Sequence, residues 1–234
     1  MADIRRRNIS QRSELINDCH NFGMIPDTRE IFLNSRTDVT LADEGAMIDH
    51  WAATNFVRNL RLLLSMNKDP ILVHMITCGG DWNYGIAIHD AIKESCESEA
   101  GAEITVLAYG HARSMSSVIP QAATHRVMMP NADFLIHWGS FGYHGNVTSA
   151  IQEAKQLEAG CETMLDIYVN RCKESTYWKE KKMGEASIRK HLRGLMDKKQ
   201  EVYWTAREAV ERGFMDAVLG DEGYETIEAL RSSK

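Results

Sequence analysis

Long apolar runs and positive charge are both scarce in this chain. No stretch of its 234 residues approaches the ~20 consecutive apolar residues of a membrane-spanning helix, and no apolar segment follows the N-terminal arginines as in a secretory signal. The formal net charge of −6 disfavours non-specific attraction to nucleic-acid phosphates. A small basic cluster, "RRR" at 5–7, is interpreted as a solvated terminus. We therefore expect neither a membrane nor a nucleic acid as a partner.

Cysteine and proline are also sparse. The five cysteines are scattered and include no C-x-x-C pair, so they predict neither a disulfide framework nor a zinc site, and they indicate a reducing cytoplasm. With only four prolines and no low-complexity stretch, the sequence offers no interdomain linker. We expect one large domain over 29–220, preceded by an N-terminal segment 1–28 and followed by a C-terminal tail 221–234.

What the chain does contain is an alternation of apolar strands and amphipathic helices. The runs "ILVHMIT" and "ITVLAYG" have almost no polar alternation, which is typical of strands buried on both faces. Strands that alternate with helices predict right-handed crossovers and a largely parallel sheet covered by helices, an α/β fold. The expected strands are 29–34, 71–77, 104–110, 125–130 and 133–138, and the expected helices cover 43–66, 86–97, a stretch from 114, 147–173 and most of 205–220.

Polar residues stand where three of these strands end, and such ends face a shared crevice in a parallel sheet. "TCGG" supplies Gly79 and Gly80, whose backbone can turn with its amides exposed. "GHARS" supplies Ser114, and "LIH" supplies His137. A hydroxyl, an imidazole and free amides are what acyl transfer needs: a nucleophile, a base and donors for an oxyanion.

Each of these residues also has a simpler explanation when it is taken alone. Ser114 stands where a helix N-cap is commonly found. His137 alone fits a hydrogen-bonded structural histidine, and a glycine pair marks many ordinary turns. Cys78 is a rival nucleophile beside the glycines, although a half-buried structural thiol is the commoner case. The combination is more specific than any member.

That combination resembles a known family, the proteolytic subunit of the Clp protease (ClpP) within the wider ClpP/crotonase fold. The resemblance runs from about Arg29 to Leu219, most of the chain. It implies stacked βαβ units with a protruding handle helix, for which 147–173 is the candidate. The segments that carry it are "ILVHMITCGGDWNYGIAIHDAI", "GHARSM", "MMPNADFLIHW" and "TAREAVERGFMDAVL".

Carried over position by position, the resemblance implies a catalytic triad. Ser114 matches the nucleophile and His137 the general base. The third member in the family is an aspartate shortly before the "A-x-E-A" helix, and an ungapped count back from that helix arrives at Asp197 in "LMDKKQ". The amides of Gly80 and Met115 match the oxyanion hole.

The resemblance also implies how substrate lies in the site. "GSFGYHGN" resembles the glycine-rich strand on which the family lays an extended peptide by added-strand pairing. No metal and no organic cofactor is implied. The positions that would bind substrate are Gly139, Ser140, Phe141 and Gly142.

Several positions depart from the family pattern. Arg113 stands where a small residue is usual, and its charge could hold an anionic intermediate or turn to solvent. "IHW" replaces "IHQ", Pro120 predicts a bent or short helix after Ser114, and the lysine-rich insertion 173–196 is longer than usual. Met196 replaces an arginine next to Asp197, which bears on the triad and on contacts between rings.

The sequence thus predicts a serine endopeptidase of the ClpP type that degrades unfolded polypeptides or peptides inside an oligomeric chamber. At ~1.5 Å per residue the helix 147–173 spans about 40 Å, more than a small domain can cover, so its apolar stripe calls for a partner chain. The resemblance supplies the geometry, two stacked heptameric rings, and a possible AAA+ unfoldase partner.

Two other functions remain open. A catalytically silent ring subunit or scaffold is favoured by Arg113 and Met196. A crotonase-like acyl-CoA enzyme shares the fold and the paired oxyanion amides, but it has no need of a serine, a histidine and an aspartate at the three matched positions.

Overall fold

The structure is a computed structural model that describes residues 9–33, 47–98, 101–140 and 142–232. Its main element is a six-stranded sheet in the order β1-β2-β4-β6-β8-β11. All neighbouring strands in it are parallel except β1, which pairs antiparallel with β2. The strands are β1 (Met24–Ile25), β2 (Glu30–Leu33), β4 (Ile71–Met75), β6 (Ile104–Ala108), β8 (His125–Met128) and β11 (Ala217–Val218). The predicted α/β class with a largely parallel sheet is confirmed.

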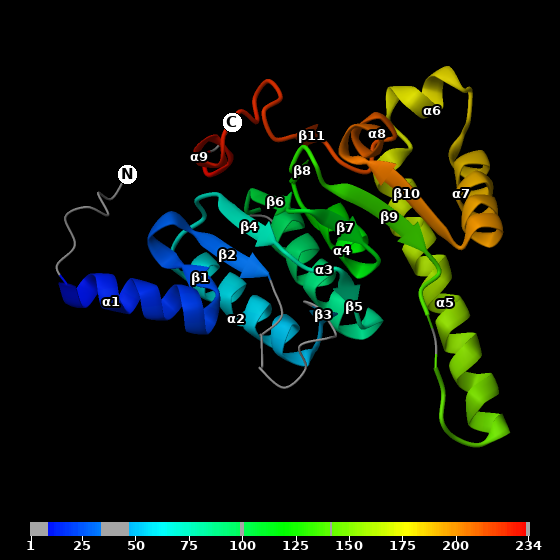
Figure 1. Cartoon of the computed structure of the whole chain (residues 1–234), viewed down its shortest axis with the longest axis horizontal. Coiled ribbons are helices and arrows are strands. Elements are labelled where there is room, and N and C mark those ends of the chain that lie inside the picture. Colours follow the sequence, from blue (N-terminus) through cyan, green and yellow to red (C-terminus); the bar gives the residue numbers. More distant parts are fainter. Residues whose placement is uncertain (1–8, 34–46, 99–100, 141, 233–234) are drawn as a thin grey trace.

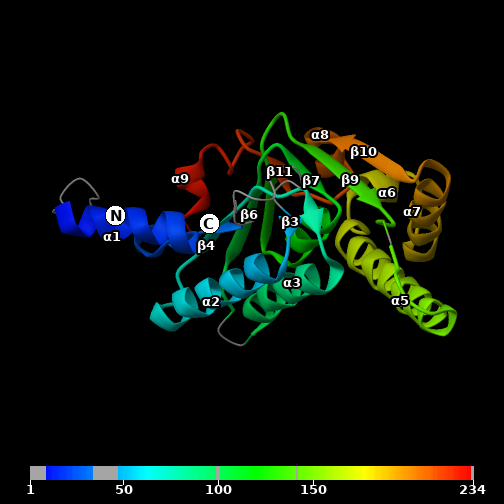
Figure 2. The ribbon, with the colours of Figure 1, turned by 60° about the horizontal axis from the view of Figure 1, so that its bottom comes forward.

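Helices cover both faces of this sheet. The long helices α2 (His50–Met66) and α3 (Trp82–Glu97) pack side by side on one face (Figure 2), where most of the apolar core lies. A smaller apolar cluster lies on the other face, where the short helix α9 (Ile227–Leu230) at the chain's end brings Leu230 onto side chains of the three central strands. Burial on both faces explains the continuous apolar runs of β4 and β6.

Two smaller sheets stand beside the main one. Strand β3 (Met47–Ile48) pairs in parallel with β5 (Gly79–Gly80). A three-stranded sheet has the order β10-β9-β7, in which β9 pairs antiparallel with β10 and parallel with β7. Its strands are β7 (His111–Arg113), β9 (Asp133–His137) and β10 (Glu201–Thr205). This sheet places the end of β9 next to the turn that follows β7.

The helix α5 (Val147–Cys172) projects from the body of the molecule (Figure 1). Its buried residues all lie in the last third, from Met164 onward. In the N-terminal half, Val147 is 76% and Ile151 53% exposed, so the predicted apolar stripe is covered over only part of its length. The remaining helices are α1 (Ile9–Asn17), α4 (Met115–Val118), α6 (Thr176–Glu180), α7 (Glu185–Lys199) and α8 (Ala206–Glu211).

The structure differs from the sequence predictions at several boundaries. The helix predicted over 43–66 begins only at His50, because Asp49 caps it by accepting from the Ala52 amide, while residues 43–46 lie outside the described ranges. Helix α3 begins at Trp82, four residues earlier than predicted, since Asp81 caps it. The helix after Ser114 is short, as Pro120 predicted, and passes into a 3₁₀-helix over Ile119–Ala122. Strands β1, β3, β5, β7 and β10 and helices α6, α7 and α9 were not predicted.

A buried ion pair ties the C-terminal helix to the sheet. The Glu30 carboxylate contacts His74 Nε2 at 2.7 Å and accepts from Arg231 at 3.0 Å. Burial alone would raise the pKa of Glu30, but hydrogen bonds from His74 and Arg231 and the charge of His74 outweigh it and lower that pKa from 4.5 to about 2. The contact therefore contributes stability that is present above about pH 4.5 and is lost as the pH falls toward 2.

Replacing Glu30 by glutamine should remove this pH-dependent contribution. We expect the free energy of unfolding of Glu30→Gln to be lower than that of the parent protein at pH 6, and the difference to shrink between pH 4.5 and pH 2, as measured by urea unfolding. Glu228→Gln, at an exposed glutamate of the same C-terminal helix, is the matched control. An equal acid loss in Glu30→Gln and the parent would contradict the assignment.

Candidate active site

Ser114 occupies a strained turn between β7 and α4. Its φ of 53° and ψ of −129° are unusual for a residue with a side chain. Its amide donates to the Leu135 carbonyl at 3.3 Å, and its own carbonyl accepts from the Ser117 amide at 2.9 Å, so the turn is held at both ends. The Ser114 side chain makes no capping hydrogen bond. The N-cap explanation therefore does not account for this serine, and strain of this kind is typical of functional positions.

The glycine pair of β5 packs directly against this turn. A Cβ on Gly79 would lie 2.7 Å from the Ser114 Cβ, and one on Gly80 would lie 2.4 Å from the backbone nitrogen of Ile48. Both glycines have positive φ, +110° and +150°, a backbone conformation that side chains disfavour. Only glycine fits at either position, and the absence of side chains lets the amides approach the first residues of α4.

A cavity of about 590 Å³ opens at this point. Its lining includes Ser114 and His137, the two residues that the sequence analysis paired as nucleophile and base. The structure thus brings together most of the predicted site. The other predicted residues in the lining are Gly80, Met115, Gly139, Ser140 and Gly142, whereas Phe141 lies outside the described residues.

One wall of the cavity was missed by the sequence analysis. The middle of α5 contributes Glu153, Gln156, Leu157, Gly160, Cys161 and Met164. The apolar stripe of this helix was assigned to contacts with another chain, and nothing in its period separates residues that face a cavity from residues that face a partner. Gly160 is a signal that could have helped, because a glycine within a helix leaves room for a neighbouring side chain, and the Trp82 ring lies next to it here.

His137 ends β9 with its ring half-buried at the cavity. Burial lowers the pKa of His137 from its ordinary value of 6.5, and the nearby charge of Glu201, which lies directly opposite in the β9–β10 pairing, acts in the other direction. The imidazole is therefore neutral near pH 7, the state that a general base requires. Its Nε2 atom is buried and has no hydrogen-bond partner among the described residues.

Asp197 lies close by but does not contact this histidine. It stands in the last turn of α7, and its Oδ1 accepts from the indole Nε1 of Trp138 at 2.9 Å. No hydrogen bond between Asp197 and His137 occurs in the part of the chain that the structure describes. The structure therefore brings Ser114 and His137 to one cavity and leaves Asp197 beside it, so the role of Asp197 stays a prediction.

Arg113 is turned away from the cavity. Its Nε donates to Asp133 Oδ1 at 2.6 Å, its second nitrogen reaches the other oxygen of the same carboxylate, and it lies over the Tyr203 ring at 5.4 Å. The hydrogen bonds to Asp133 raise the pKa of Arg113. An arginine that donates to both oxygens of one carboxylate is not free to hold an anionic intermediate, so this part of the sequence interpretation is not supported. Cys78, the rival nucleophile, is exposed and lines the cavity mouth.

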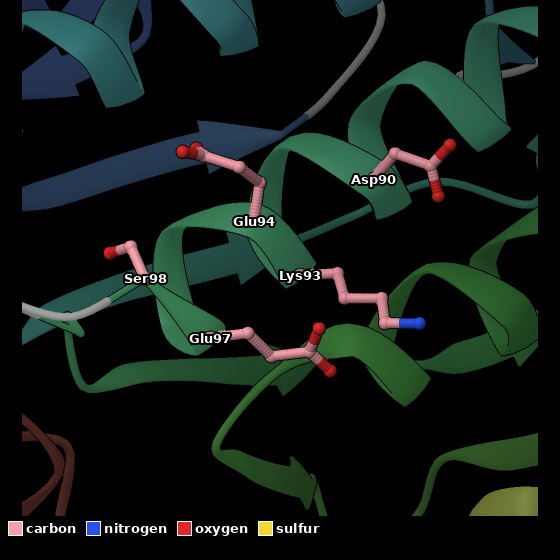
Figure 3. Close-up of a pocket in the computed structure, with 5 residues that line it drawn as sticks. All are labelled: Asp90, Lys93, Glu94, Glu97 and Ser98. Atoms are coloured by element: carbon pink, nitrogen blue, oxygen red, sulfur yellow. The ribbon is translucent and has the colours of Figure 1, made fainter.

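A second hollow, of about 370 Å³, lies on the outer surface of α3 (Figure 3). Its side chains splay apart rather than converge on one point, and Glu94 pairs with Arg61 of α2 at 3.3 Å. The hollow holds no nucleophile beside a base, and we read it as a solvated helix face. Among the described residues, no group of three acidic, histidine or cysteine side chains is placed to hold a metal ion, and no helix is both long and apolar enough to cross a membrane.

The sequence is also similar to those of known proteins. A family model described as Clp protease matches residues 20–222. The ATP-dependent Clp protease proteolytic subunit of Deinococcus radiodurans is 28% identical over 178 residues, which are 75% of this chain and 78% of that protein. The ATP-dependent Clp protease proteolytic subunit 2 of Treponema denticola is 29% identical over 191 residues, 80% of this chain and 83% of that protein.

Proposed function

The chain belongs to the Clp protease family, and we propose that it is a serine endopeptidase that cleaves unfolded polypeptides or peptides inside an oligomeric chamber. The observation that carries the proposal is the strained Ser114, which shares one cavity with a neutral, half-buried His137. A serine held in a strained turn and an unprotonated imidazole in the same cavity are the two side chains from which an activated nucleophile is built.

In the proposed mechanism, Ser114 Oγ attacks the scissile carbonyl while His137 takes its proton and later gives it to the leaving amine. The amides of Gly80 and Met115 hold the oxyanion, a contribution of about 2.7–4 kcal/mol per donor in other hydrolases. Asp197 orients the imidazole and stabilises its charged form. Substrate lies along Gly139, Ser140, Phe141 and Gly142 as an added strand.

We further propose that the chain assembles into two stacked heptameric rings and works with an AAA+ unfoldase. The exposed N-terminal half of α5, with Val147 76% exposed, supports the assembly because apolar side chains there need a cover. The names of both relatives, proteolytic subunits of ATP-dependent proteases, support an ATPase partner. A closed chamber also explains how such a hydrolase is tolerated in the cytoplasm, the compartment that the scattered cysteines predict.

Native mass spectrometry after treatment with a fluorophosphonate tests the activity and the assembly together. The reagent phosphonylates an activated serine, which loses its proton as the reagent loses fluoride, so we expect one adduct per chain, mapped to Ser114 by peptide analysis, on particles whose mass corresponds to fourteen chains.

Each of the other possible results would overturn one part of the proposal. Labelled monomers or dimers would overturn the chamber and keep the peptidase. Unlabelled rings would overturn the peptidase and favour the silent ring subunit. An adduct on Ser116 or Cys78 would overturn the choice of nucleophile.

A further inference from the structure

A tryptophan holds the carboxylate that the proposed mechanism needs. Trp138 follows His137 directly at the end of β9, and its indole Nε1 donates to Asp197 Oδ1 at 2.9 Å. Arg193, one turn before Asp197 on α7, lies over the Trp138 ring at 5.5 Å. Arg193 is in turn ion-paired with Glu162 of α5. The indole is therefore fixed from one side by the cation and from its edge by the carboxylate.

Unlike Trp138, His137 has no hydrogen bond to a carboxylate in the described structure. Its Nε2, the ring nitrogen that faces the serine in a triad, is buried without a hydrogen-bond partner among the described residues, and no hydrogen bond in this region joins the ring to Asp197. The carboxylate that influences its charge is Glu201, across the strand pair. A carboxylate shared between the indole and the imidazole would appear as a His137–Asp197 hydrogen bond, and none joins these residues in the described structure. In the state described here, Asp197 is committed to Trp138.

The position of Asp197 allows its carboxylate to change hydrogen-bond partner. The donor residue and the histidine are neighbours in the chain, and Asp197 lies three residues before Gln200, where α7 ends with a positive φ of 62°. Asp197 is exposed, so its side chain can change rotamer without repacking the core. A hydrogen bond at such a surface site is weak enough to exchange.

From this geometry we propose that Trp138 is a positioning residue that holds Asp197 in a resting position, and that transfer of this carboxylate from the indole N–H to the imidazole N–H of His137 makes the site competent. The inference rests on the proposed function, because it assumes that His137 is the base and Asp197 its partner. It assigns a role to Trp138, the residue of "IHW" that replaces the glutamine of the family pattern "IHQ".

The test is Trp138→Phe, which keeps an aromatic ring under Arg193 and removes the N–H. We expect kcat for a fluorogenic peptide, and the rate of inactivation by a small fluorophosphonate, each to rise about three- to tenfold, the range for losing one exposed charge-assisted hydrogen bond. KM should not change. Trp51→Phe, at an exposed tryptophan of α2, is the matched control and should leave both rates as they are.

A second pair of variants separates positioning from packing. In an Asp197→Asn background no carboxylate can be transferred, so Trp138→Phe should no longer raise either rate, and loss of the gain would support the inference. A lower kcat in Trp138→Phe would overturn it by showing that the indole holds Asp197 in its productive position. A change in KM alone would also overturn it, since Trp138 lines the cavity and would then act on substrate.

The same measurements distinguish this inference from the proposed function. If the parent protein labels at Ser114 and Trp138→Phe labels at the same rate, the inference fails while the peptidase stands. If Ser114 labels in neither protein, the proposed function fails first.

Discussion

Replacing Ser114 by alanine should abolish peptide cleavage, with kcat lowered on the order of 10⁶-fold, as when the nucleophile of other serine hydrolases is removed. The oxyanion amides and the substrate strand would remain, so KM should change little and the residual rate should still exceed that of water. The measurement is turnover of an unstructured fluorogenic peptide at saturating concentration. The alanine keeps a Cβ at the strained position, so the turn between β7 and α4 should be preserved.

Another serine of the chain, Ser65, provides the control for this variant. Ser65 is exposed on α2, where its hydroxyl donates to the Leu62 carbonyl at 2.7 Å, and Ser65→Ala should keep full turnover. Comparable melting curves for the parent and both variants would show that the loss is chemical. Appreciable turnover by Ser114→Ala would move the nucleophile to another residue, with Cys78 at the cavity mouth as the first to test by alkylation.

Asp197→Asn should lower kcat by about 10⁴-fold, the effect of placing the histidine of a triad in the wrong tautomer. The asparagine keeps an oxygen that can accept from the Trp138 indole, so the contact observed at 2.9 Å is retained while the negative charge is removed. The variant therefore tests the negative charge of Asp197 separately from its contact with Trp138. It should still bind peptide with an unchanged KM and assemble as the parent does.

Glu201 is the matched control for this experiment, because it lies directly opposite His137 and acts on its charge. Glu201→Gln should reduce turnover only slightly. A reversal, with Glu201→Gln inactive and Asp197→Asn active, would make Glu201 the partner of the imidazole. Near-native turnover in both variants would point to a serine–histidine dyad.

The fold was predictable wherever a segment is buried on two faces. The runs that became β4 and β6 are almost wholly apolar and are buried at every position, as in the interior of a parallel sheet. Strand β10 was missed because its burial alternates, with Val202 and Trp204 inside and Tyr203 outside. Such a short amphipathic run does not predict a strand until its antiparallel partner β9 is known.

The sequence by itself determined the sheet, the meeting of Ser114, His137 and the glycine pair, and the family, because these depend on local pattern: strand ends, a turn that requires glycine, and motifs of adjacent residues. The tertiary structure alone decided the rest. It placed Arg113 on Asp133, the middle of α5 along the cavity, and Asp197 on Trp138. Each of these joins segments at least twenty residues apart, from Arg113 and Asp133 at 20 to Trp138 and Asp197 at 59. Side chains so distant in the chain meet only through packing, and the donor from which the Asp197 carboxylate accepts is decided by distances that no spacing in the sequence records.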